Sequence, residues 1–222
     1  MNLTLFDLDG TLLPIDSDHA FGDFLAQQGW VDGDSWRTRN DGFYQDYCEG
    51  RLDLDAYVAF TTSGWRHRPL EEALALRERF MVEVLQPALH DNARALVERH
   101  RAAGDLMALV TATNVFVTAP IAQAFGFEHL IGVELTRDAQ GRYTGAVAGV
   151  PSFQVGKITR VNQWLTGLGR RFEEFAVTTC YSDSMNDLPL LEAVSHPVAT
   201  NPSAVLQALA QERGWPVLKL FP

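Results

Sequence analysis

Polar side chains follow three short apolar runs of this sequence, at points where strands of a parallel sheet would end. The polar segments are residues 7–11, 111–114 and 182–187, which carry aspartates, threonines and asparagines. Because ligands of parallel α/β sheets bind at the carboxyl ends of the strands, we expect the three segments to share one rim. Lys157, near the start of the helix that precedes the third run, would bring a positive charge to that rim.

Four aspartates at one rim would repel one another unless a cation neutralises them: Asp7, Asp9, Asp183 and Asp187. Mg²⁺ prefers oxygen ligands and commonly binds substrate phosphate, and it would lower the charge of a phosphoryl group that a carboxylate attacks. Asp7 and Asp9 are two residues apart and share one face of an extended strand, so one can attack while the other transfers protons. Gly10 permits a sharp turn and the close approach of a bound anion.

The strands and helices that would hold this rim alternate along the chain. Apolar runs predict short strands at residues 3–8, 106–110, 175–181, 196–199 and 216–220. Amphipathic periodicity predicts helices at residues 91–103, from 155 to about 167, and 203–213. This alternation predicts an α/β fold, a doubly wound parallel sheet with helices on both faces.

Residues 17–85 interrupt the alternation, because they show helical periodicity and little strand signal. They predict helices at residues 18–28, 36–48, 54–62 and 70–84. These helices would form an α-helical cap inserted between strand 1 and strand 2. Its aromatic core would include Phe24, Trp36, Phe43, Tyr47, Tyr57 and Phe60.

Residues 133–147 form a second interruption, where alternating residues predict a β-hairpin that turns at residues 138–141. The helical insert divides the chain into two parts. We expect a catalytic core made of residues 1–14 and 87–222, and a helical cap made of residues 15–86.

Four motifs of the sequence resemble those of the haloacid dehalogenase-like (HAD) hydrolase superfamily. An apolar strand followed by DxDGT stands at residues 6–11, a strand-end threonine at Thr111, a lysine at Lys157, and an acidic pair at Asp183 and Asp187. Each motif alone is weak, whereas all four in order and at suitable spacings are specific. The resemblance covers essentially the whole chain and implies a Rossmann-like core with an inserted cap. The helical insert resembles in particular the cap of the phosphoserine phosphatase-like subgroup, subfamily IB.

The resemblance implies a role for each matching residue. Asp7 would be the nucleophile that forms an aspartyl-phosphate, and Asp9 the general acid and base. Mg²⁺ would be bound by Asp7, by the main-chain carbonyl of Asp9 and by Asp183. The phosphate would be held by Gly10, Thr11, Thr111 and Lys157.

Three further residues would support these groups. Asp187 would hold Lys157 or a metal-bound water in place, and Asn114 and Asn186 lie at the ends of the same strands. Ser182 departs from the pattern, since the residue before the first aspartate of the fourth motif is often glycine. We expect this change to be tolerated because a small residue is retained.

An aspartate at position 9 favours hydrolysis of a phosphoester or transfer of a phosphoryl group to another alcohol, because dehalogenase-type relatives lack it. The expected enzyme is a phosphatase acting on a small phosphorylated metabolite. Residues 12–19, together with Asn40, Phe43, Tyr44 and Tyr47, resemble a branch that includes histidinol-phosphate phosphatases. Histidinol phosphate and phosphoserine are therefore the expected substrates. A phosphotransferase or mutase that uses the same intermediate remains open, as does a catalytically idle binding module with the same fold.

Asp16 and Asp18 would lie at the hinge between core and cap, where they could meet an ammonium or imidazolium group of the substrate. Ser17 and Asp18 would also make a good helix N-cap, and both readings stay open. His19 is a weaker candidate for a substrate contact, since a partly exposed structural histidine is the commoner case.

The composition limits the possible partners. The 222 residues include 18 Lys plus Arg and 28 Asp plus Glu, giving a net charge of −10 that disfavours binding to nucleic acid. The start of the chain lacks the pattern of a signal peptide and no membrane span is predicted, so a cytoplasmic protein is expected. Cys48 and Cys180 are expected to be reduced, buried thiols. The oligomeric state cannot be predicted from the sequence.

Overall fold

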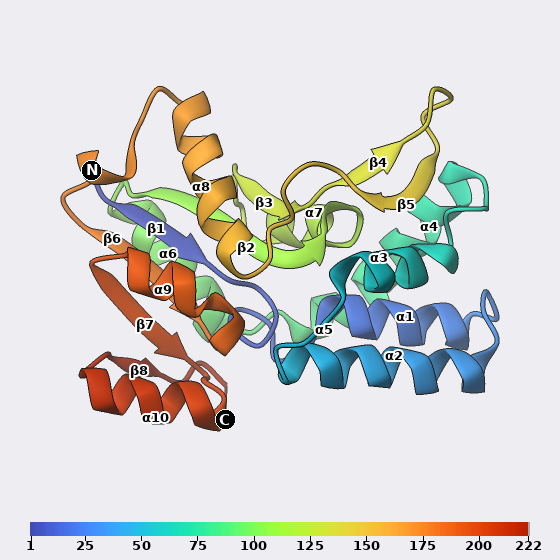
Figure 1. Cartoon of the computed structure of the whole chain (residues 1–222), viewed down its shortest axis with the longest axis horizontal. Coiled ribbons are helices and arrows are strands. Elements are labelled where there is room, and N and C mark those ends of the chain that lie inside the picture. The colour runs from blue at the N-terminus through green and yellow to red at the C-terminus, as the bar shows by residue number, and fades with distance from the viewer. Residues whose placement is uncertain (222) are drawn as a thin grey trace.

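A six-stranded parallel sheet forms the centre of the computed structural model, which describes residues 1–221 (Figure 1). The strand order is β3-β2-β1-β6-β7-β8, and all neighbouring strands are parallel. In that order, the strands are Leu130–Val133, Leu106–Asn114, Leu3–Phe6, Thr178–Ser182, His196–Thr200 and Val217–Leu218. The chain builds outward from β1 first on one side and then on the other. The carboxyl end of β1 is therefore the switch point at which ligands of such sheets bind.

The central strand β1 is buried along its whole length, as expected for a strand covered on both faces. Leu3 and Leu5 pack into one apolar cluster, and Phe6 packs into the other. Helices α6 (Asp91–Ala102) and α7 (Val115–Ala124) contribute to the Phe6 cluster. Helices α8, α9 and α10 contribute to the opposite cluster, and they are Val155–Gly167, Leu188–Ala193 and Ala204–Arg213. The predicted doubly wound α/β fold is confirmed.

The predicted cap insert is also present, because four helices lie between β1 and β2. They are α1 Ser17–Gln27, α2 Gly33–Cys48, α3 Leu54–Ser63 and α4 Leu70–Phe80. A π-helical turn (Met81–Leu85) and the short α5 (Gln86–Ala88) continue α4 toward the core. Figure 1 shows the cap helices to one side of the sheet, with the hairpin of β4 (Leu135–Arg137) and β5 (Tyr143–Val147) beside them. The division at residues 14/15 and 86/87 stays a prediction.

Several elements differ from the prediction. Helix α7 and strand β3 were not predicted; α7 is apolar on most of its surface and contains Pro120, so it lacks an amphipathic period. Strand β2 runs on to Asn114, through the polar residues expected to follow it. Two 3₁₀ turns, Phe172–Glu174 and Met185–Asp187, precede β6 and α9. Of the two cysteines, both free, only Cys180 is buried, so the prediction for Cys48 was wrong.

The part of the chain that the structure describes contains no helix with the length and apolar character needed to cross a bilayer.

Candidate active site

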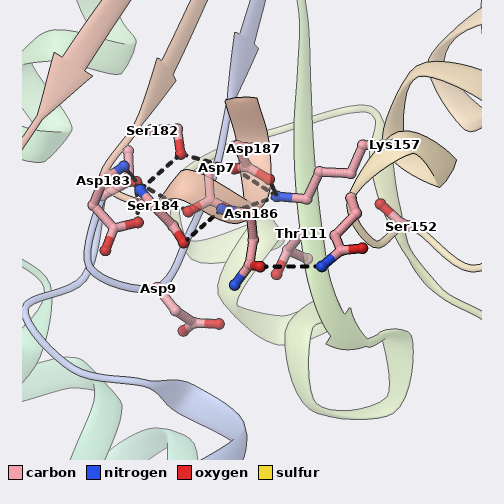
Figure 2. A network of polar contacts seen from close by, with 12 residues as sticks. Asp7, Asp9, Thr111, Ser152, Lys157, Ser182, Asp183, Ser184, Asn186 and Asp187 are labelled. Carbon is pink, nitrogen blue, oxygen red and sulfur yellow. Dashed lines mark hydrogen bonds and ion pairs between the residues drawn. The ribbon is translucent and has the colours of Figure 1, made fainter. Parts of the chain in front are cut away.

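Asp7 follows β1 directly and lies at the switch point of the sheet (Figure 2). Its backbone N–H donates to the carbonyl of Tyr181 on β6 at 3.0 Å, which extends the sheet pairing by one residue. The chain then folds sharply back, since the amides of Thr11, Leu12 and Leu13 all donate to the carbonyl of Leu8 at 3.2, 2.8 and 3.0 Å. This turn keeps the side chains after β1 close to the strand end.

Lys157 reaches the site from the first turn of α8 and is 1% exposed. Its Nζ donates to Asp7 Oδ1 at 2.8 Å and to Asp187 Oδ2 at 2.8 Å. Burial disfavours its charge, but the carboxylates of Asp187 and Asp7 outweigh that effect and raise its pKa. Burial raises the pKa of Asp187 to about 6, although the ammonium of Lys157 opposes this rise. The three side chains thus form a buried ion cluster.

Thr11 links Asp7 to the acidic loop after β6. Its Oγ1 lies 3.0 Å from Asp7 Oδ2 and 3.4 Å from Asp183 Oδ1, and it accepts a hydrogen bond from the Asp183 amide at 3.1 Å. Gly10 lies against the carboxylate of Asp183, because a Cβ added to Gly10 would be 2.2 Å from Asp183 Oδ2. With φ of +75°, Gly10 also has a backbone conformation that favours glycine.

Asp9 is separate from the lysine cluster, as Figure 2 shows. Its carboxyl group accepts hydrogen bonds from the Ser17 amide and from Thr113 Oγ1, both at 2.8 Å. Burial of the carboxyl group, the nearby Asp16 and, to a smaller extent, Asp7 raise its pKa well above the usual value. The two neighbouring aspartates therefore have different surroundings, one beside a lysine and one beside neutral donors.

A small cavity lies between these aspartates and the cap. From the core it is lined by Asp7, Asp9, Thr111, Ala112 and Thr113, and from the hinge and cap by Asp16, Asp18, Phe43, Tyr44, Tyr47, Leu52, Leu54 and Tyr57. The lining includes no lysine, arginine or histidine within the described chain. Tyr47 and Tyr57, predicted as core aromatics of the cap, face this cavity instead.

Asp16 and Asp18 lie at the start of α1, and both line the cavity. Asp16 is the N-cap, since its Oδ1 accepts from the His19 amide at 2.8 Å, so the predicted capping by Ser17 and Asp18 was wrong. Asp18 is buried and accepts from Asn114 Nδ2 at 3.2 Å, and burial together with Asp16 raises its pKa to about 7. The ring of His19 pairs with Asp41 at 2.8 Å and does not line the cavity.

The acidic loop is held by side chains around it. Ser182 Oγ donates to Asp187 Oδ2 at 2.8 Å, so the residue that departs from the motif takes part in the cluster. Asn186 Nδ2 donates to the carbonyl of Tyr47 at 3.0 Å, which joins the loop to the cap. Asn114 caps α7 through a bond from the Val117 amide at 3.2 Å. The roles of Thr113, Ser182 and Tyr57 in the site were not predicted.

The donor set fits a divalent cation of the Mg²⁺ type. In residues 1–221 no group of three or more His, Cys, Asp or Glu side chains forms a ready-made metal cage. Mg²⁺ does not require one, since one or two carboxylates, water and phosphate commonly complete its shell. Asp7 and Asp183 both lie within hydrogen-bonding distance of Thr11 Oγ1. Burial, Asp7 and Asp187 raise the pKa of Asp183 well above its usual value, as expected where negative charge lacks a counter-ion.

Residues 4–192 match the family model described as haloacid dehalogenase-like hydrolase. A histidinol-phosphatase of Neisseria meningitidis serogroup C (strain 8013) is 44% identical over 217 residues, which cover 98% of each chain. A phosphoserine phosphatase of Mycobacterium tuberculosis (strain H37Rv) is 34% identical over 225 residues, covering 96% of this chain and 68% of that protein.

Solved structures share the fold of this chain. A protein of unknown function from Bordetella pertussis Tohama I has a TM-score of 0.94 and 50% identity, with 99% of both chains covered. A substrate-bound phosphoserine phosphatase has the same fold with a TM-score of 0.69 and 16% identity, covering 98% of this chain and 92% of that one.

The chain therefore belongs to the haloacid dehalogenase-like hydrolase family. Within the family it belongs to the branch that resembles phosphoserine phosphatases and histidinol-phosphate phosphatases, as the four motifs predicted. The predicted enzyme class, a HAD-type phosphatase, is confirmed by the same relatives.

Proposed function

We propose that the protein is a Mg²⁺-dependent phosphomonoesterase that hydrolyses a small, positively charged phosphorylated amino alcohol through an aspartyl-phosphate on Asp7. Histidinol phosphate is the best candidate. The observation that carries this proposal is the placement of Asp7. It is a buried carboxylate at the end of β1, bound to Lys157 at 2.8 Å, and it lines a cavity that Asp9, Asp16 and Asp18 also line.

In the first half of the reaction, an oxygen of Asp7 attacks phosphorus and the bond from phosphorus to the substrate oxygen breaks. Asp9 gives its proton to the departing alcohol. In the second half, Asp9 takes a proton from water, which attacks the phosphorus of the aspartyl-phosphate and releases inorganic phosphate. The raised pKa of Asp9 supports this assignment, because a general acid must carry its proton near the working pH.

The phosphate oxygens would be held by neighbours of Asp7. Lys157 supplies a fixed positive charge, while Asp187 and Ser182 hold its position. Thr111 lines the cavity beside Asp7, and Gly10 would supply a backbone amide, whereas the Thr11 amide already donates to the Leu8 carbonyl. Mg²⁺, held by Asp7, Asp183 and the main-chain carbonyl of Asp9, would neutralise charge on the phosphoryl group.

The charge of the cavity supports the choice of substrate. Asp16 and Asp18 line it together with Asp7 and Asp9, and Tyr57 of the cap lines it as well. An imidazolium or ammonium group would meet these carboxylates. A substrate carboxylate, as in phosphoserine, would find no cationic side chain among the lining residues, and a buried charge without a partner is costly. The 44% identical histidinol-phosphatase of Neisseria meningitidis supports the same choice.

The chemistry is tested by Asp7→Asn, which keeps the size of the side chain and removes its nucleophilic charge. We expect phosphate release from an aryl phosphate to fall at least about 10³-fold, while the melting temperature stays near that of the wild type. Wild-type activity should be lost in EDTA and restored by added Mg²⁺.

The exposed Asp34→Asn is a matched control, since Asp34 lies on α2 away from the cavity. Activity of the Asp7 variant close to that of this control would rule out Asp7 as the nucleophile. Release of less phosphate than alcohol would instead indicate transfer to an acceptor.

A further inference from the structure

Gln154 has a backbone conformation that is rare for any residue other than glycine. Its φ is 47° and its ψ is −126°. The Gly156 amide donates to the carbonyl of Phe153 at 2.9 Å, so Gln154 occupies the first central position of a tight turn of type II′. That position favours glycine, and a larger residue there is strained. A glutamine at this position implies that its side chain compensates for the strain.

The side-chain amide of Gln154 lies between the core and the cap. Its Nε2 lies 3.4 Å from the carbonyl of Gly50 and 3.3 Å from Asn186 Oδ1. Asn186 in turn donates to the carbonyl of Tyr47 at 3.0 Å. Tyr47 lies in the last turn of α2, and Gly50 follows the C-cap residue Glu49. Two side-chain amides of the core thus contact main-chain carbonyls at the end of a cap helix.

The backbone of Gln154 has a second task, because it begins α8. Its carbonyl accepts a hydrogen bond from the Lys157 amide at 3.1 Å. Gln154 thus lies one helical turn before the lysine whose side chain binds Asp7. Gln154 also lines a groove of about 1480 Å³ on the acidic-loop side of the site, together with Asp183, Asn186 and Tyr47. One strained residue therefore contacts the lysine helix, the acidic loop and the cap.

We propose that Gln154 is a positioning residue that latches the end of α2 onto the core and so holds the cap over the phosphate site. Its effect on turnover rests on the proposed function, whereas its effect on the cap does not. The strained turn orients the amide toward Gly50 and Asn186, and a glycine would relax the turn but could not make the contact.

The test compares Gln154→Gly and Gln154→Ala with Gln163→Ala, a control at an exposed position of the same helix. Gln154→Gly should keep or raise the melting temperature, because the turn loses its strain. In the same variant, amide hydrogen exchange in residues 46–52 should become about tenfold faster, because the cap opens more often. Gln154→Ala should open the cap equally while keeping the strain, and should be the less stable variant.

Turnover gives the second readout. With an amino alcohol phosphate, kcat/KM of Gln154→Gly should fall about tenfold, mainly through KM, since fewer molecules have a closed cap. The proposal would be overturned if Gln154→Gly matched Gln163→Ala both in amide hydrogen exchange of residues 46–52 and in kcat/KM. Faster exchange with unchanged kcat/KM would also overturn it. If the wild type hydrolyses no phosphoester, the proposed function fails, and the exchange measurement alone decides whether Gln154 latches the cap.

Discussion

The hydroxyl of Ser182 is buried and makes two hydrogen bonds at the fourth motif. It donates to Asp187 Oδ2 at 2.8 Å and accepts from the Ser184 amide at 3.2 Å. Asp187 also binds Lys157, so the hydroxyl helps to orient the carboxylate that holds the lysine. Serine in place of glycine was expected to be tolerated because it is small. The structure also gives its hydroxyl oxygen two hydrogen-bond partners.

Ser182→Ala removes this hydrogen bond without changing the backbone. Because the bond joins buried groups, one of them charged, we expect the free energy of unfolding to fall by about 1–2 kcal/mol. The value of kcat/KM should fall by less than about tenfold, since Lys157 keeps both carboxylate partners. Urea unfolding and steady-state kinetics measure the two effects. Ser35→Ala, at an exposed position of the cap, is the control. If Ser182→Ala is as stable as this control, the hydroxyl of Ser182 is dispensable.

A second polar cluster joins elements behind the site. His100 on α6 lies 2.7 Å from Asp105 Oδ2 through Nδ1 and 2.8 Å from the Tyr181 hydroxyl on β6 through Nε2. Thr4 on β1 donates to the same carboxylate at 3.1 Å. Two strands and a helix that position Asp7 are thus tied together at the level of Phe6, whose ring stacks on Tyr181 at 5.1 Å.

Asp105→Ala should destabilise the protein by about 2 kcal/mol at neutral pH, because a buried charged acceptor is lost. Burial alone would raise the pKa of Asp105, but hydrogen bonds from His100, Thr4 and Asn2 outweigh it and lower the pKa. A lowered folded-state pKa means that stabilisation is complete above the unfolded pKa of about 3.9 and is lost below it. The difference in melting temperature between wild type and variant should therefore shrink below about pH 4. A difference that is constant down to pH of about 3 would contradict this account.

Elements with a clear amphipathic period or a fully apolar run could be predicted from the sequence. Helices α6, α8 and α10 and strand β1 lie close to their predicted bounds. Helix α7 could not be predicted, because half of its residues are buried and its apolar character hides the helical period. Strand β3 is only four residues long and was not predicted, since the predicted hairpin began at residue 133.

Some residues of the candidate site could likewise be predicted from the sequence, and others could not. Asp7, Asp9, Thr111, Lys157 and Asp183 could be predicted as candidates because they stand in the four family motifs, and their roles stay predictions. Thr113 and Gln154 could not be found, because their contacts join residues that lie more than a hundred positions apart. The Thr113 contact depends on how β2 lies beside the turn after β1, and the Gln154 contact on how the cap docks onto the core, which no local pattern records.

At the scale of the whole molecule, the cavity combines two opposite requirements. Near β1 it must accept an anionic phosphate, for which Lys157 and a divalent cation would supply positive charge. Toward the cap it presents Asp16 and Asp18, together with aromatic side chains. A substrate with a phosphate at one end and a cation at the other satisfies both ends at once.

Asp18→Asn tests the cap end of this account. Replacing the carboxylate by an amide should raise KM for histidinol phosphate about tenfold, because a charged partner of the substrate is lost. The KM for an aryl phosphate without a cationic group should change little, since that substrate has no cation to bind. Equal changes for both substrates would remove Asp18 from the recognition of the substrate.

The most direct measurement is kcat/KM of the wild-type enzyme for histidinol phosphate and for phosphoserine, determined side by side with Mg²⁺. The two molecules share a phosphorylated alcohol, but only phosphoserine carries a carboxylate, for which the cavity lining offers no cation. We expect histidinol phosphate to be preferred by at least about 10²-fold. Equal values, or a preference for phosphoserine, would contradict the account.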